Sequence, residues 1–296
     1  MSMSTTKPAV TRRTALGTLG AGVLGLALAP RGRTALAQDA SPMATPEPDF
    51  VALFDGTAAS FADWHPTGPG RFELIDGAIV TGSNSGNFAE LALLYYTPRT
   101  FGDFVLRLKF RIADPGDNSG VFVRFRDPGT PIPDAELEGP DAATLYPSRA
   151  DYAANILFMA ADTGFEAQIN GSAELTSDPS RDDTGALWGV PIGIGPGKQD
   201  YQPAPPLQLG EWSEMENEVV GDIYTIRLNG QQTTTFANPE SRRGQSPSED
   251  PLSGYIGLQS IPFTTGHTDF RHIRIRELPE AGGAATPTAS GGAQSC

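Results

Sequence analysis

Residues 104–112 alternate between apolar and mostly charged side chains, and few folds accommodate such a run. Side chains of a β-strand point alternately to its two faces, so this run predicts a strand with one buried face and one charged face. The buried face would carry Phe104, Leu106, Leu108, Phe110 and Ile112. The rest of the chain shows no long helical periodicity and no internal repeat, so the sequence indicates an all-β protein.

Further strands and turns follow the same logic. Residues 121–126 form a second alternating run. Residues 72–75 and 78–80 flank Asp76-Gly77, and residues 224–228 run into Asn229-Gly230 and a Thr-rich segment. Asp-Gly and Asn-Gly favour the two-residue turns of β-hairpins, so two hairpins are predicted here.

The segment from Phe50 to Leu278 is long enough for one large β domain, and its many strands with intervening turns predict a sandwich or jelly roll. Two excursions interrupt the strand pattern, at residues 127–162 and 172–206. Long irregular segments in a compact domain are usually functional or disordered, and we expect both excursions to border a ligand site.

The two ends of the chain differ from this middle. Residues 1–37 hold Arg12-Arg13, a Gly/Ala-rich apolar run at 16–29 and small residues at 35–37. This pattern predicts a twin-arginine signal peptide and an exported protein; the alternative, a membrane anchor, needs a longer apolar run. The Pro-rich linker at 38–49 and the Gly/Ala-rich tail at 279–296 are predicted to be disordered.

Charge and cysteine content exclude some functions. The net charge is −14, and removal of the leader, with its five positive charges and no negative ones, leaves −19. A mature chain this acidic is not expected to bind nucleic acid or an acidic membrane surface. Cys296 is the single cysteine, so no disulfide can form within the chain.

The stretch FEAQI, residues 165–169, places Glu166 and Gln168 on one side of a predicted strand and three apolar residues on the other. A carboxylate and a carboxamide on one face can be ordinary solvent-facing residues. They can also line the wall of a binding site. The residues alone leave both readings open.

Eleven motifs occur in an order that resembles the 3-keto-disaccharide hydrolase domain family. The resemblance covers Phe50 to Leu278. The motifs are LFDG (53–56), FADW (61–64), LLYY (93–96), FGDFVLRLKFR (101–111), NSGVFVR (118–124), TGFEAQI (163–169), TGALWG (184–189), GEW (210–212), LNG (228–230), GYIGLQ (254–259) and FRHIRI (270–275).

This resemblance implies a concanavalin A-like (laminin-G-like) jelly roll in an exported protein that acts on glycosides already oxidised to a ketone at C3. A base removes the proton at C2, the resulting enolate expels the group at C1, and water adds afterwards. The implied site residues are catalytic Glu166 and Arg124, with Asn118, Gln168, Trp188 and Gln259 as substrate-binding residues.

In this hypothesis Glu166 is the base, and burial would have to raise its pKa for that role. Arg124 and Gln168 would polarise the carbonyl and bind sugar hydroxyls. Arg124 in direct contact with Glu166 would lower the pKa of the carboxyl, so the two side chains should be close without forming a tight pair.

No metal site and no cofactor are predicted. Related sequences commonly have a histidine shortly after the position of Gln259, and here the nearest one is His267; Asn170 also stands where they often have Asp. The three histidines show no zinc-binding spacing. The acidic residues Asp178, Asp182 and Asp183 do not match a calcium loop.

Two other functions remain open at the level of the sequence. A noncatalytic, lectin-like module with the same jelly roll would also need polar groups and an aromatic platform. A structural or adhesion protein would instead expose Glu166 and Gln168 to solvent. For the enzyme and for the lectin-like module, the expected partner is a carbohydrate.

Overall fold

The computed structural model describes residues 49–82, 91–126, 160–161, 163–171, 183–238, 253–261 and 267–279. The predicted leader, nearly all of the linker and tail, and most of the first excursion lie outside these residues. The described part contains fourteen strands and one short helix, α1 (Ala58–Phe61). No helix in it is long and apolar enough to cross a membrane.

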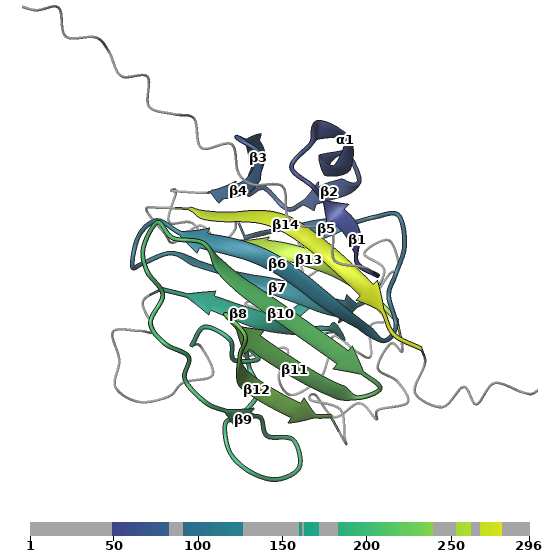
Figure 1. Ribbon diagram of the computed structural model, residues 1–296, viewed down its shortest axis with the longest axis vertical. Coiled ribbons are helices and arrows are strands. Elements are labelled where there is room, and N and C mark those ends of the chain that lie inside the picture. The colour runs from purple at the N-terminus through teal and green to yellow at the C-terminus, as the bar shows by residue number, and fades with distance from the viewer. Residues whose placement is uncertain are drawn as a thin grey trace, which may run out of the picture. The chain divides into compact units, whose positions relative to one another are not determined.

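The strands form two antiparallel sheets (Figure 1). In the nine-stranded sheet the order is β3-β4-β14-β6-β10-β11-β12-β9, and β1 pairs with β14. Its strands are β1 (Val51–Phe54), β3 (Arg71–Ile75), β4 (Ala78–Gly82), β6 (Phe104–Ile112), β9 (Asp200–Tyr201), β10 (Ser213–Val220), β11 (Ile223–Leu228), β12 (Gln231–Ala237) and β14 (Thr268–Glu277).

The five-stranded sheet has the order β2-β5-β13-β7-β8. Its strands are β2 (Trp64–Thr67), β5 (Ala92–Tyr96), β7 (Asn118–Phe125), β8 (Phe165–Asn170) and β13 (Tyr255–Ser260). The two sheets confirm the predicted all-β sandwich of the jelly-roll type.

Both predicted hairpins are present. Asp76 and Gly77 have φ values of 49° and 75°, and Asn229 and Gly230 have 50° and 80°. Positive φ at both central residues is the geometry of a type I′ turn, whose twist matches that of the flanking strands. These turns join β3 to β4 and β11 to β12.

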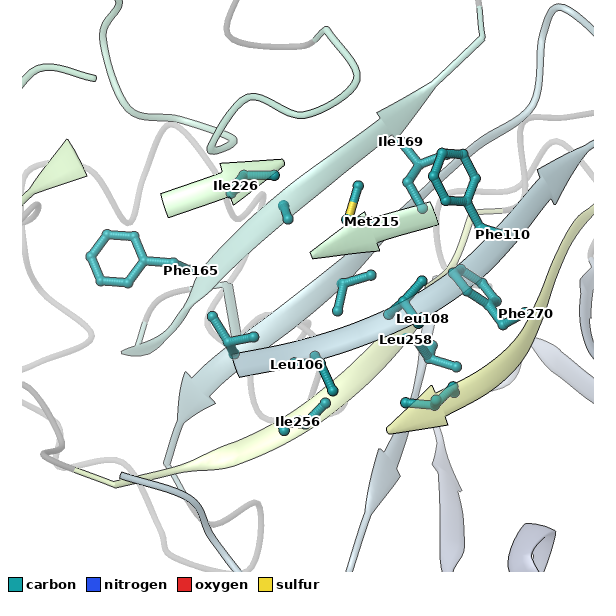
Figure 2. Packing of buried hydrophobic residues seen from close by; sticks show 14 of the residues in the cluster. Leu106, Leu108, Phe110, Phe165, Ile169, Met215, Ile226, Ile256, Leu258 and Phe270 are labelled. Carbon is teal, nitrogen blue, oxygen red and sulfur yellow. The ribbon is translucent and has the colours of Figure 1, made fainter. Parts of the chain in front are cut away.

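One apolar core fills the space between the sheets, and Figure 2 shows side chains from both sheets meeting in it. Leu106, Leu108 and Phe110 of β6 enter this core from the nine-stranded sheet. Phe165 and Ile169 of β8 enter it from the five-stranded sheet. The alternation in both strands therefore separates an inner apolar face from an outer polar one, as the sequence predicts.

The outer face of the nine-stranded sheet carries charges that pair across neighbouring strands. Glu216 of β10 lies opposite Arg107 of β6 and Arg227 of β11 in the strand register. Its carboxylate accepts hydrogen bonds from both guanidinium groups, at 2.5 and 2.6 Å. Arg227 also donates to Glu218 at 2.7 Å. Direct cross-strand pairing of opposite charges stabilises a sheet.

The described part of the second excursion, from residue 183 onward, is tied to both sheets. Its residues Gly185 to Trp188 run along the free edge of β8, with an antiparallel bridge between Ala167 and Leu187. Further along, β9 pairs with β12 at the edge of the other sheet. The excursion therefore covers the backbone of an edge strand, which would otherwise expose unpaired N–H and C=O groups.

Candidate functional site

Glu166 and Gln168 lie on the outer face of the five-stranded sheet. Their neighbours Phe165, Ala167 and Ile169 all belong to the inter-sheet core, so the two polar side chains point the opposite way. The register of β7 and β8 places Glu166 opposite Phe122 and Gln168 opposite Gly120. Directly paired residues share a face, so these four positions face outward together.

Burial decides between the two readings of FEAQI. Glu166 is 3% exposed and Gln168 is 4% exposed, although both lie on an outer face. Ordinary solvent-facing residues on a sheet do not lose their hydration in this way, because burial of a carboxylate or amide is costly. The structural or adhesion reading, which predicts exposed side chains at both positions, does not match this burial.

Two further predicted residues lie beside them. Asn118 is half-buried at the start of β7, and its Oδ1 accepts a hydrogen bond from Nε2 of Gln168 at 3.3 Å. Asp117, directly before it, is fully buried and accepts backbone N–H bonds from Ala113 and Asp114 at 2.8 Å. Burial raises the pKa of Asp117, and these hydrogen bonds only partly offset it. Asp117 thus anchors the loop that leads into Asn118.

Gln259 occupies the neighbouring strand β13. It is opposite Leu93 of β5, and its main-chain oxygen accepts a 2.6 Å hydrogen bond from Oγ of Ser119 in β7. The side chain is 7% exposed, and its Oε1 has no hydrogen-bond partner among the residues that the structure describes. A buried acceptor without a donor is unfavourable, and a ligand hydroxyl is a suitable partner for it.

Trp188 borders Glu166 at the edge of the sheet. Its main-chain N–H donates to the main-chain oxygen of Glu166 at 2.9 Å. Leu187 points into the core opposite Ala167, so the alternation of side chains places half-buried Trp188 on the same side as Glu166. An indole at this position can stack on the apolar face of a sugar ring.

Gln199 holds this segment in place, and sequence reasoning did not identify it. Its Oε1 accepts from the N–H of Leu187 at 2.7 Å, and its Nε2 donates to the oxygens of Leu187 and Val190 at 2.8 and 2.7 Å. The side chain is fully buried. Nothing in the Gly/Pro-rich sequence around Gln199 marks it, because its role depends on a loop that folds back on itself.

Arg124 does not lie on the outer face with Glu166 and Gln168. The prediction that it shares a face with Phe122 is wrong. Its φ is +54°, and the register between β7 and β13 shifts at this point, so a bulge turns the side chain to the other side. The guanidinium is 2% exposed and donates to the oxygens of Gly102 and Gly221 and to Oδ1 of Asp103. Its hydrogen bonds thus join β7 to the segment before β6 and the β10–β11 turn.

Apart from His65 and Thr67 of β2, which lie opposite Tyr95 and Leu93, the remainder of the outer face is largely apolar. A second buried cluster contains Leu91, Leu93, Phe122, Phe125, Ala160 and Ala161. Half-buried Tyr95 and Tyr255 pack against it, with their ring centroids 5.7 Å apart. The polar groups therefore gather over β7 and β8 and at Gln259, while apolar groups cover most of β5 and β13.

The five strands of this sheet contain one acidic residue, Glu166. Among the described residues, no group of three histidine, cysteine, aspartate or glutamate side chains is placed to hold a metal ion. Of the three aspartates considered for calcium, Asp178 and Asp182 lie outside the described residues. The site is therefore one carboxylate with carboxamides and a tryptophan around it.

The chain is similar to several solved structures, the first of which supports the fold. A candidate glycosyl hydrolase from Parabacteroides distasonis ATCC 8503 is 20% identical, with 77% of this chain and 99% of that chain covered and a TM-score of 0.51. A second candidate glycosyl hydrolase from the same organism is 16% identical, with 78% and 94% covered and a TM-score of 0.47. A Bacillus subtilis protein of unknown function with a galectin-like fold is 13% identical, with 76% and 93% covered and a TM-score of 0.43.

No curated protein matches the chain. The model of the 3-keto-alpha-glucoside-1,2-lyase-like domain matches residues 49–276, which include every described strand except the last residue of β14. The chain therefore belongs to the 3-keto-alpha-glucoside-1,2-lyase-like domain family, and its function is carbohydrate-related.

Proposed function

We propose that the protein is an enzyme that cleaves glycosides already oxidised to a ketone at C3, with Glu166 as the base that removes the proton at C2. The observation that carries this proposal is the position of Glu166. It is a nearly fully buried carboxylate, the one acid in its sheet, with Gln168 and Gln259 on the same outer face. The name of the family to which the chain belongs supports the same chemistry.

The reaction needs one base rather than two opposed carboxylates. A ketone at C3 makes the hydrogen at C2 acidic, because the electron pair left behind is delocalised onto the carbonyl oxygen. When the enolate re-forms the carbonyl, a double bond forms between C1 and C2 and the C1–O bond breaks, with its electron pair leaving on the aglycone. Water then adds to the enone. An ordinary glycosidase instead places two carboxyl groups about the glycosidic bond.

Carboxamide N–H groups can take the role that the sequence analysis gave to Arg124. The enolate oxygen carries the developing negative charge and needs preorganised donors. Asn118, Gln168 and Gln259 provide neutral N–H donors near Glu166. Because these donors are uncharged, they can stabilise the enolate without holding Glu166 in a permanent ion pair.

The first experiment is a pair of incubations of residues 38–296, the chain without its predicted leader. One contains a plain disaccharide and the other its 3-keto derivative, each with and without added divalent metal, and the products are separated by chromatography. Under the proposal only the keto-sugar is cleaved. In deuterated water, deuterium should enter C2 of unreacted keto-sugar, because proton removal there precedes cleavage.

Glu166→Gln tests the base directly. The change keeps the shape of the side chain and removes its basicity, so cleavage should fall by roughly 10²- to 10⁴-fold while the protein stays folded. Glu73→Gln, which alters an exposed glutamate of β3, is the matched control and should keep the parent rate. Normal cleavage by Glu166→Gln protein would rule out Glu166 as the base.

A noncatalytic carbohydrate-binding protein is the second candidate function. Half-buried Trp188 suits the binding of a neutral sugar as well as its conversion, and so does Oε1 of Gln259, which has no partner among the described residues. Calorimetric titration with the same two sugars separates the candidates. Binding of either sugar without cleavage or deuterium exchange would favour the binding protein.

A further inference from the structure

Gly120 lies in the middle of β7, directly opposite Gln168 of β8, and faces outward without a side chain. A Cβ atom added there would lie 1.9 Å from Oε1 of Glu166 and 2.6 Å from its Cγ and Cδ. Cβ atoms essentially never come within 3.0 Å of a heavy atom to which they are not bonded. The carboxylate of Glu166 therefore occupies the volume that any side chain at position 120 would fill.

Backbone conformation does not explain a glycine at this position. Gly77 and Gly230 have positive φ values that turns require, and Gly120 is not among the glycines with positive φ. Glycine inside a strand costs about 0.5–1 kcal/mol relative to alanine. The conformation of the strand would accept alanine at this position. The remaining reason for a glycine is that the carboxylate of Glu166 fills the space above it.

The position of this space matters because of the neighbouring strands. Leu258 of β13 pairs with Val121 of β7, so the next residues, Gln259 and Gly120, are also neighbours across the two strands. Gln259, Gly120 and Gln168 thus form a row across β13, β7 and β8. A carboxylate that leans over Gly120 lies within that row, between the two glutamines.

A second glycine receives a side chain from the opposite direction. A Cβ atom at Gly257 of β13 would lie 2.8 Å from Cδ1 of Leu93, which comes from β5. Glu166 from β8 and Leu93 from β5 therefore lean toward the middle of the sheet over one glycine each. The apolar branch of Leu93 and the carboxylate of Glu166 approach the centre of the face from its two sides.

We propose that Gly120 is a positioning residue for Glu166: the absence of a side chain at 120 lets the carboxylate lie low on the sheet, in line with Gln168 and Gln259. This inference rests on the proposed function of Glu166 as the base. A substrate would then lie above β7 and β13, with its C2–H bond directed at the sheet.

Gly120→Ala is the test. The added methyl group must push the carboxylate away from the sheet, and a displacement of about 1 Å at a reacting group can cost on the order of 100-fold in rate. We expect kcat for the 3-keto-disaccharide to fall by about that factor, with a smaller change in KM. Gly82→Ala in β4 is the matched control, because the three atoms nearest to its added Cβ belong to the exposed Arg71 side chain, the closest at 3.3 Å.

Shortening the acid should compensate for the added methyl group. In the double variant Gly120→Ala, Glu166→Asp the carboxylate needs less room, so the protein should recover part of the activity that Gly120→Ala loses. If Gly120→Ala fails to fold, the double variant should still fold. A double variant no better than Gly120→Ala in activity or folding would contradict the proposal.

A measurement without substrate separates this inference from the proposed function. In protein labelled with ¹³C at the glutamate Cδ, the Glu166 signal is the one missing from Glu166→Gln protein. Its titration midpoint should move in Gly120→Ala and stay unchanged in Gly82→Ala. If the parent protein cleaves no 3-keto-glycoside, the proposed function fails while this titration still tests the position of the carboxylate. An unchanged midpoint in Gly120→Ala would overturn the role of Gly120.

Discussion

The two outer faces of the sandwich both carry polar side chains, but the surroundings of these side chains differ. On the nine-stranded sheet, carboxylates and guanidinium groups alternate across strands, and Glu216 is bound by Arg107 and Arg227. On the five-stranded sheet, Glu166 is the one acid of its strands and lies on a face with carboxamides and glycines. The first face pairs its charges across strands, and the second places a single carboxylate among carboxamides and glycines.

The difference shows how stability and function divide between the sheets. Charges that pair across a register stabilise the strands that carry them. A buried acceptor such as Oε1 of Gln259, with no partner in the described structure, contributes nothing to folding and is typical of a ligand site. Substitutions on the first face should therefore change stability, whereas substitutions on the second should change activity.

The largest effect is expected at Arg124, which lies on neither face. Arg124→Met removes a buried guanidinium and leaves Asp103, 8% exposed, without its 2.7 Å partner. Removal of one member of a buried ion pair typically costs about 3–5 kcal/mol. Urea unfolding should show a loss of this size. If Arg124→Met protein is as stable as the parent but has little turnover, Arg124 has a catalytic role instead of a structural one.

Glu216→Gln should have the next largest effect. Burial alone would raise the pKa of Glu216, but hydrogen bonds from Arg107 and Arg227 outweigh it and lower the pKa below the ordinary 4.5. A lowered pKa in the folded state stabilises the protein above the pKa of the unfolded state, and this contribution is lost as pH falls through the folded value.

We therefore expect Glu216→Gln to reduce the free energy of unfolding by about 1–3 kcal/mol at pH 7, with unchanged turnover. The difference from the parent protein should shrink as pH falls below 4.5, where the unfolded parent carboxylate takes up a proton, and should vanish once the folded carboxylate is protonated as well. Denaturant unfolding at several pH values measures both. A difference that grows as pH falls would contradict the assignment.

Phe50→Leu tests the aromatic contribution on the nine-stranded side. The guanidinium groups of Arg107, Arg276 and Arg274 lie 4.8, 5.2 and 5.7 Å from the ring centroid of Phe50. Leucine keeps apolar bulk and loses the ring face, so a loss of about 0.5–1 kcal/mol is expected in urea unfolding. Parent-like stability of Phe50→Leu would show that the ring contributes only apolar packing.

Gln259→Met should have the smallest effect on stability and a clear effect on activity. The methionine has a similar shape and removes a buried acceptor that has no partner in the described part of the chain, so the free energy of unfolding should stay constant or rise slightly. Turnover of the 3-keto-sugar should fall about tenfold, as expected for a lost hydrogen bond of about 1.4 kcal/mol in the transition state. A large loss of stability would place Gln259 among the structural residues.

Regular features of the fold could be predicted because they depend on short stretches of sequence. The alternation in residues 104–112 fixed the buried face of β6, and Asp76-Gly77 and Asn229-Gly230 fixed two hairpins. The alternation in residues 165–169 also placed Glu166 and Gln168 on one face, although it could not predict that both side chains are buried there.

The irregular features could not be predicted, because each depends on contacts between distant segments. A bulge at Arg124 turns its side chain to the other face, and no local sequence pattern predicts a positive φ at an arginine. Gln199 fixes the segment of Trp188 through a loop closure. Gly120 reads as an ordinary strand glycine until β8 is placed beside it.

The positions of β13 and β14 have a consequence for how this chain is made. Among the described strands these are the last two in chain order, yet β13 lies between β5 and β7, and β14 lies between β4 and β6. A nascent chain that ends before residue 255 therefore has a gap in the interior of each sheet. Both sheets can therefore be completed only after translation has passed β14, which makes their closure depend on contacts between segments far apart in the chain.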